Sequence, residues 1–295
     1  MDPLVERIIV ELIMGLTNGM ILALIASGFT LILGVMNIVN FAHGEFHMAG
    51  AYAGWMILLL IGPTAFGFWV TVVLAAVGVG LMGWLVERSV LADTHGGDPF
   101  NPLLITFGLA LVFQQAALVI FGTIGKFVAS PIEASIPLFD LQLPVYRLVI
   151  MVVSALIIFG LALFIKYTHW GVWIRAIVQN REMAACMGVP VPRVYQLVFS
   201  IGCGLAAASG VLVAPIFSVS ASMGTDIIIT AFIIVVIGGL GSLTGTIIAA
   251  LLIGELETLG SLFVPGSQAQ IFSFVVLMVF LLVRPQGIMG ERGLM

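Results

Sequence analysis

The chain has 295 residues, 61% of them hydrophobic and only 8% charged, with a formal net charge of −4. An average soluble domain is roughly 45–50% apolar and about 25% charged, so this chain has too few charges to cover a water-exposed surface. The composition excludes a soluble globular protein, a nucleic-acid binder and a disordered chain, and two cysteines are too few for a disulfide scaffold. We therefore expect an all-α polytopic membrane protein, surrounded by membrane lipid and folded as a single transmembrane domain over residues 1–295.

Long apolar runs predict about eight to nine membrane-embedded helices, because a bilayer core of about 30 Å needs roughly 20 apolar helical residues per crossing. The expected helices cover residues 8–34, 44–61, 66–86, 103–121, 146–165, 194–217, 226–238, 246–263 and 270–283. Glycines inside them, such as Gly19, Gly78 and Gly202, are expected to lie on packing faces, since helices associate in lipid by close backbone contact.

A polar interruption near residues 37–45 separates the first two expected helices. Polar side chains flanked by apolar helix are costly at membrane depth and usually face a bundle interior or an aqueous cavity. Asn37, Asn40, His43 and Glu45 are therefore candidate residues of a translocation pathway. The alternative is a solvated turn that only caps two helices. A metal site is not expected, because His43 and His47 with their intervening residues do not form the H-E-x-x-H pattern.

The loop over residues 166–193 has the highest density of positive charge. It carries four of the ten basic residues, namely Lys166, Arg175, Arg181 and Arg193. The positive-inside rule places such a loop in the cytoplasm. Counting crossings outward from it predicts an N-terminus outside the cytoplasm and a C-terminus inside.

Within this loop, a helix of about two turns is expected over residues 180–188. Asn180 is a suitable N-cap, Glu182 complements the N-terminal dipole, and Gly188 ends the helix. We expect an exposed face of small residues, Ala184 and Ala185. Short isolated helices are marginal in water, so this one needs a surface to dock on, either its own membrane domain or a separate cytoplasmic protein.

A glycine cluster near residues 238–245 forms the second interruption. The preceding apolar run is too short to span a bilayer, and Gly238, Gly239 and Gly241 predict a helix break inside the protein. Together with the break near 37–45, this gives paired interruptions in the two halves of the chain, which indicate a transport pathway between structural repeats.

Motifs for catalysis are absent from the sequence. It contains no G-x-x-x-x-G-K-[ST] run, so it cannot bind ATP by that motif, and serine-hydrolase and zincin patterns are missing as well. We expect a chain without catalytic residues and without a cofactor of its own. If ATP drives transport, a partner chain must bind it.

Four stretches of the sequence resemble the permeases of branched-chain amino acid ABC importers, and the resemblance covers almost the whole chain. The stretches are N-F-A-H-G-E at 40–45, the pattern of small and polar residues at 171–188, the glycine cluster at 237–242, and residues 283–287. Of these, N-F-A-H-G-E is the most specific.

The resemblance implies a bacterial inner-membrane transport subunit with a defined set of partners, and in such a membrane the outward N-terminus expected from the charge count is periplasmic. The partners are a homologous second permease chain, two cytoplasmic ATPase subunits that bind ATP, and a periplasmic substrate-binding protein. It also implies that the short helix is a coupling helix, with Arg175, Asn180, Glu182, Ala184 and Gly188 as coupling residues. ATP-driven closure of the ATPase pair then moves this helix, and the permease pair rocks between two open states.

Two alternatives stay open at this point. The same permease type is implied for urea, short amides and other small organic acids. A different class is a stand-alone channel or ion-coupled transporter, in which Glu45, Asp226 or Glu255 would bind an ion. A solitary transporter has no need of a docking helix in its cytoplasmic loop, so that loop distinguishes the two classes.

Overall fold

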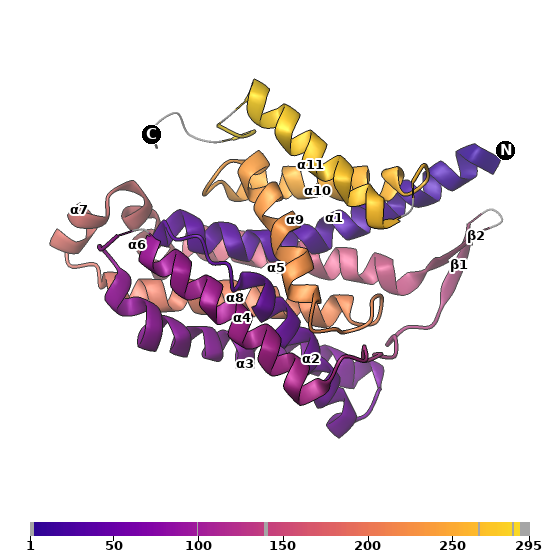
Figure 1. Cartoon of the computed structure of the whole chain (residues 1–295), viewed down its shortest axis with the longest axis horizontal. Helices are drawn as coiled ribbons and strands as arrows, with labels where there is room; N and C mark the ends of the chain where they lie inside the picture. The colour runs from indigo at the N-terminus through magenta and orange to yellow at the C-terminus, as the bar shows by residue number, and fades with distance from the viewer. Residues whose placement is uncertain (1–2, 99, 139–140, 265, 285, 290–295) are drawn as a thin grey trace.

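A computed structural model describes residues 3–98, 100–138, 141–264, 266–284 and 286–289 (Figure 1). Its longer helices are α1 (Pro3–Met36), α2 (His43–Ile61), α3 (Ala65–Val86), α4 (Phe100–Phe121), α5 (Val145–Tyr167), α8 (Val191–Val213), α9 (Met223–Gly238), α10 (Leu243–Gly260) and α11 (Gly266–Val283). The shorter elements are a π-helical turn η1 (Glu87–Leu91), a 3-10 turn η2 (Ala92–Thr94), α6 (His169–Gln179), α7 (Arg181–Cys186), and strands β1 (Ser135–Leu138) and β2 (Leu141–Pro144).

Each of the nine expected apolar helices has a counterpart, which confirms the all-α polytopic fold. Within the described residues, seven helices are long and apolar enough to cross a membrane, and α9, with 16 residues, is shorter. Several elements were not expected from the sequence. These are the turns η1 and η2, the helix α6 and the antiparallel hairpin β1–β2, in which Ser135 pairs with Pro144.

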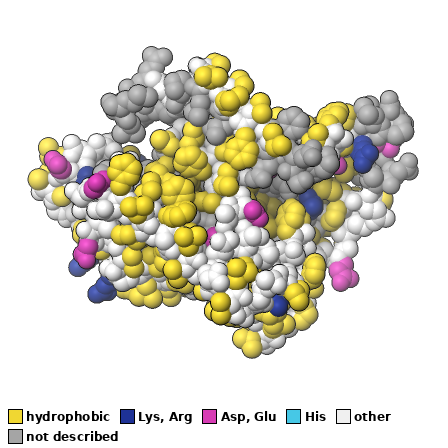
Figure 2. Space-filling view, viewed as in Figure 1, with side chains coloured by type: hydrophobic (Ala, Val, Ile, Leu, Met, Phe, Trp, Pro, Cys, Tyr) yellow, Lys and Arg dark blue, Asp and Glu magenta, His cyan; other side chains and the backbone are white. Residues whose placement is uncertain are grey.

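The core of the bundle is built on α1 and α8. A run of four residues in α1, from Ala23 to Ala26, is completely buried, as is typical of a helix enclosed on all sides by protein. α1 packs along α10, and α8 packs along α3 and α2. By contrast, α4 exposes large apolar side chains such as Leu104, Phe107 and Leu111, and apolar side chains are spread over the middle of the face in Figure 2. Such a surface suits lipid rather than water.

Glycines set how closely these helices approach. A Cβ at Gly19 would lie 2.9 Å from Leu251 Cα of α10, and one at Gly202 would lie 2.9 Å from the Gly28 carbonyl oxygen of α1. The expectation of packing faces is confirmed for these two positions. It was wrong for Gly78, which is exposed and where a Cβ would have no atom within 4 Å, because this part of α3 faces away from the bundle.

Two opposite ends of the molecule stand out in Figure 1. The start of α1 and the β1–β2 hairpin lie at one end, and α6 and α7 lie at the other (Figure 1). Most long helices run between these ends, whereas α9 runs steeply across them in this view. The loop predicted to carry the docking helix is therefore at the opposite end from the N-terminal part of the chain.

Candidate functional site

The first interruption is an ordered turn over residues 37–42. Asn37 has a left-handed backbone (φ 55°), and its N–H donates to Leu33 O at 2.9 Å, which closes the last turn of α1. The Asn40 side chain is completely buried, and its Oδ1 accepts a hydrogen bond from the Ala42 N–H at 3.1 Å. Asn37 is exposed, so the two asparagines of the predicted pathway lie in different environments.

Three polar side chains on the first turns of α2 are buried against three different helices, and we call His43, Glu45 and His47 the α2 cluster. Each is 0–2% exposed. His43 Nε2 donates to Ile25 O of α1 at 3.1 Å. Glu45 Oε1 accepts a hydrogen bond from the Thr225 hydroxyl of α9 at 3.3 Å. The predicted site residues His43 and Glu45 thus belong to α2 itself rather than to the loop before it.

His47 joins α2 to α8. Its Nδ1 lies 2.7 Å from Ser209 Oγ, and the Ser209 hydroxyl donates to Ala206 O at 2.7 Å. Because that hydroxyl has a single proton, the ring nitrogen of His47 is the donor between them. Polar contacts therefore connect α2 to α1, α8 and α9 inside an apolar bundle.

The Glu45 carboxylate faces the first turn of α9. A Cβ at Gly224 would lie 2.6 Å from Glu45 Oε2, so a side chain there would push the carboxylate out of its present position. A Cβ at Gly44 would overlap the Gly224 carbonyl oxygen. A negative charge near a helix N-terminus is favourable, because it faces the positive end of the helix dipole. α2 and α9 are consequently in backbone contact beside the cluster.

Three buried atoms in this region have no hydrogen-bond partner among the described residues: Asn40 Nδ2, His43 Nδ1 and Glu45 Oε2. Leaving a buried polar atom unpaired costs about 1–3 kcal/mol, so three of them within six residues are unusual. Such atoms gain a partner only when the helices move or when a polar molecule reaches them. The structure brings these three predicted residues together and leaves Asn37 apart.

Removing the acceptor of His47 should destabilise the bundle. In a Ser209→Ala chain, the buried ring N–H of His47 loses its partner, and we expect a loss of about 1–3 kcal/mol in the free energy of unfolding. Thermal unfolding of the purified chain measures it. The matched control is Ser89→Ala, an exposed serine bonded to its own helix, with an expected change within about 0.5 kcal/mol. Equal midpoints for both variants would contradict the role of the hydrogen bond.

The second interruption is a tight turn over residues 239–242 between α9 and α10. Gly239 and Gly241 have left-handed backbones (φ 101° and 82°), which other residues rarely adopt. Ser242 Oγ accepts a hydrogen bond from the Gly245 N–H at 3.2 Å and caps α10. A Cβ at Gly34 would lie 2.9 Å from Gly241 Cα. The second break therefore packs against α1 only three residues before the first break begins.

The C-terminal residues fold back onto this glycine turn. The Ile288 N–H donates to Ile237 O at 2.8 Å, and the Met289 N–H donates to Gly238 O at 3.2 Å. These bonds satisfy carbonyl groups that the end of α9 leaves free. Gly287 (φ 82°) is buried against Gly239. Of the 283–287 stretch, residue 285 lies outside the described residues.

The loop at 166–193 is mostly helical. Thr168 caps α6 by accepting a hydrogen bond from the Gly171 N–H at 3.0 Å, and a Cβ at Gly171 would overlap Ile165 O, so α6 folds back tightly on the end of α5. This helix was not predicted, although the spacing of its buried residues Gly171, Ile174 and Ile177 is that of one helix face.

The short helix α7 is confirmed, with the expected residues at its two ends. Asn180 Oδ1 accepts a hydrogen bond from the Met183 N–H at 2.9 Å, and Glu182 lies in the first turn. Gly188 has a left-handed backbone (φ 85°), and its N–H donates to Ala185 O at 3.0 Å, which closes the C-terminal end.

One expectation about this loop needs correction. Ala184 is only 4% exposed and packs on the membrane domain, so the exposed small-residue face is reduced to Ala185. The reason is that α7 has fewer than two turns, and a segment this short does not reveal which side faces the protein. Arg175 is exposed, but its guanidinium donates to the carbonyl oxygens of Ile165 and Lys166 at the end of α5, where it joins α6 to α5.

The sequence was also compared with protein families and with known proteins. The model of the family described as "Branched-chain amino acid transport system / permease component" matches residues 11–283. The chain is 31% identical to the high-affinity branched-chain amino acid transport system permease protein LivH of Salmonella typhimurium strain LT2, over 94% of each chain. It is 29% identical to the corresponding permease protein BraD of Pseudomonas aeruginosa, over 98% of each chain.

Among solved structures, the fold is similar to that in "PsaBC from Streptococcus pneumoniae in complex with Fab". The TM-score is 0.51 with 13% sequence identity, covering 92% of this chain and 91% of the other. At this identity the likeness concerns the fold alone.

Proposed function

Since this chain belongs to the permease family of branched-chain amino acid ABC transport systems, we propose that it forms the translocation pathway of an importer for branched-chain amino acids. ABC importers of this family work with ATPase subunits and a binding protein. We assign to this chain two cytoplasmic ATPase subunits that bind ATP, a homologous second permease and a periplasmic binding protein. The N-terminus of α1 then faces the periplasm of a bacterial inner membrane, and α7 faces the cytoplasm.

The geometry of α7 carries this proposal. Ala184 anchors the helix on the membrane domain, while the side chains of Met183 and Met187, four residues apart, are 61% and 80% exposed. Methionine is flexible and apolar, and it is enriched in protein interfaces. α7 is capped at both ends and held on the membrane domain by Ala184. Met183 on the helix and Met187 directly after it then form a docking surface for an ATPase subunit.

Asn40 and two members of the α2 cluster support the assignment of a pathway. A zwitterionic amino acid needs polar groups along its route, and the unpaired atoms of Asn40, His43 and Glu45 supply a donor, a ring nitrogen and a carboxylate oxygen. These groups lie where α1, α2, α8 and α9 meet. A rotation of α9 against α2 would expose them to a substrate.

Affinity purification and reconstitution test the function directly. The tagged chain, purified from its native membrane, is expected to bring down ATP-hydrolysing subunits. The reconstituted complex with its binding protein should import labelled leucine only when ATP is supplied, with urea and acetamide as competing solutes. Robust leucine transport by the purified chain alone in liposomes would contradict the proposal and favour a stand-alone transporter.

A charge on the docking surface should break the complex. In a Met187→Glu chain, an acidic group replaces an exposed apolar one, and we expect recovery of the ATPase subunits to fall about tenfold, which corresponds to about 1.4 kcal/mol of binding free energy. Met187→Leu keeps an apolar side chain and should retain the wild-type recovery. Because Met187 is exposed, both chains fold alike, and equal recovery would show that the ATPase binds elsewhere.

A further inference from the structure

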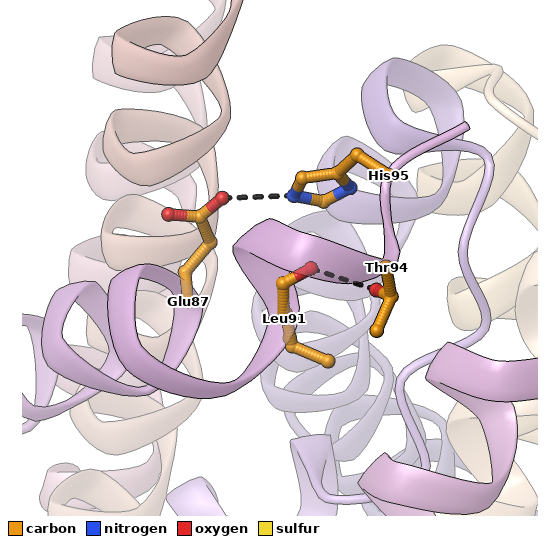
Figure 3. Close-up of polar contacts among 4 residues, drawn as sticks. All are labelled: Glu87, Leu91, Thr94 and His95. Atoms are coloured by element: carbon orange, nitrogen blue, oxygen red, sulfur yellow. Dashed lines mark hydrogen bonds and ion pairs between the residues drawn. The ribbon is translucent and has the colours of Figure 1, made fainter. Parts of the chain in front are cut away.

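The end of α3 holds a second buried polar group that the pathway does not use. His95 Nε2, in the loop after η2, donates to Glu87 Oε1 at 2.9 Å (Figure 3). Glu87 is 1% exposed, and its Oε2 has no hydrogen-bond partner among the described residues. A buried carboxylate is costly unless it is paired, so the position of Glu87 depends on that of His95.

The backbone around this pair is not a regular α-helix. Glu87 begins the π-helical turn η1, in which the Ala92 N–H donates to the Glu87 carbonyl five residues earlier. The Thr94 hydroxyl donates to Leu91 O at 2.7 Å and holds the end of the turn (Figure 3). π-helical turns are rare and are frequent at functional sites. This one interrupts the regular hydrogen-bond pattern at the end of α3, beside the buried pair.

Tyr195, on the second turn of α8, contacts this pair and α7 together. The His95 and Tyr195 rings pack with centroids 4.8 Å apart and planes at 63°. The Arg181 guanidinium, from the first turn of α7, lies over the same tyrosine ring with its Cζ 5.5 Å from the centroid. Arg181 is exposed and Tyr195 is 3% exposed. A continuous set of contacts therefore leads from the surface of α7 to the buried Glu87.

We propose that Tyr195 is a positioning residue that passes the movement of α7 to the end of α3, by contacting Arg181 and the His95–Glu87 pair at once. The inference rests on the proposed function, because α7 moves only if an ATPase subunit holds it. The chain link between α7 and α8 passes through Gly188, a glycine in a left-handed conformation, and carries no side-chain contact to α3. Besides the packing of Ala184, the ring of Tyr195 gives α7 a side-chain connection that reaches both α8 and the His95–Glu87 pair.

The same helix connects this contact to the pathway. α8 carries Tyr195 near its start and Ser209 near its end, and Ser209 bonds His47 of the α2 cluster. A displacement of Tyr195 is therefore felt both at α3, through His95, and at the α2 cluster, through the body of α8.

Two variants of the tyrosine test the proposal in the complete transporter, reconstituted with its ATPase subunits and binding protein. The measured quantity is the number of leucine molecules imported per ATP hydrolysed. Tyr195→Phe keeps the ring face for Arg181 and should keep the wild-type ratio, whereas Tyr195→Leu keeps apolar volume without a ring. We expect Tyr195→Leu to hydrolyse ATP. The number of leucine molecules that it imports per ATP should be at least about fivefold lower than in the wild type. A wild-type ratio in Tyr195→Leu would overturn the proposal.

A second pair of variants avoids the buried position. Arg181→Gln and Arg193→Gln each remove one positive charge from an exposed side chain at the same end of the molecule, so both should fold. Only Arg181→Gln is expected to lower the ratio, and equal ratios would overturn the proposal. If Tyr195 and Arg181 only stabilise the fold, their variants change the amount of complex recovered but not the number of leucine molecules that each complex imports per ATP. If the wild-type chain brings down no ATPase subunit, the proposed function itself fails, which is a separate result.

Discussion

Uptake by a Gly188→Val chain should be abolished although the chain still inserts in the membrane, whereas Gly188→Asn should retain most of it. Gly188 has a φ of 85° at the end of α7. A β-branched residue in the left-handed region costs about 1–3 kcal/mol, while asparagine tolerates that conformation far better. The strain is relieved by opening the last turn of α7, which displaces Met187 from the docking surface.

The measurement is import of labelled leucine by ATP-loaded membrane vesicles, corrected for the amount of chain in the membrane. Gly160→Val is the matched control, because Gly160 is exposed on α5 with no atom within 4 Å of a Cβ and an ordinary helical backbone. It should import normally. Normal import by Gly188→Val would mean that the end of α7 has no part in coupling.

A single methyl group at Gly50 should lower the thermal midpoint of the chain by about 6–12 °C, equivalent to about 3 kcal/mol in a protein of this size. A Cβ at this position of α2 would overlap backbone atoms of Ala207 in α8. Backbone atoms cannot rotate away as a side chain can, so the two helices must separate. Ala207 lies two residues from Ser209, and the separation also weakens the contact of His47 with α8.

Gly78→Ala provides the same chemical change without the clash. Gly78 lies on α3 with nothing within 4 Å of a Cβ, and alanine is a better helix former than glycine by about 1 kcal/mol. Its midpoint should stay at or slightly above that of the wild type. The comparison is made on detergent-purified chains by size-exclusion chromatography after heating. A Gly50→Ala midpoint equal to that of Gly78→Ala would contradict the close contact between α2 and α8.

The membrane helices could be predicted from sequence because lipid makes apolar length decisive. The same rule cannot find α6, which has 11 residues and includes Arg175 and His169, or the four-residue strands of the hairpin. The prediction that Ala184 is exposed was also wrong. α7 is too short for a periodic pattern to show which of its faces is buried.

In each contact of the candidate site, the sequence predicted one of the two partners and not the other. His43 and Glu45 are conspicuous because they are polar groups among apolar helices. Their partners are a backbone carbonyl at Ile25 and a hydroxyl at Thr225, and neither has a sequence signal. Contacts of this kind join positions far apart in the chain, so they follow from the packing of helices and not from any local pattern.

The bonds from residues 288 and 289 to the end of α9 join parts of the chain that are synthesised at different times. During synthesis, α9 and α10 enter the membrane before α11 has been made, and the carbonyl groups of Ile237 and Gly238 then lack the partners they have in the finished fold. They receive them only when Ile288 and Met289 arrive. The last residues of the described chain therefore complete the hydrogen bonding at the end of α9, beside the glycine turn that packs on Gly34.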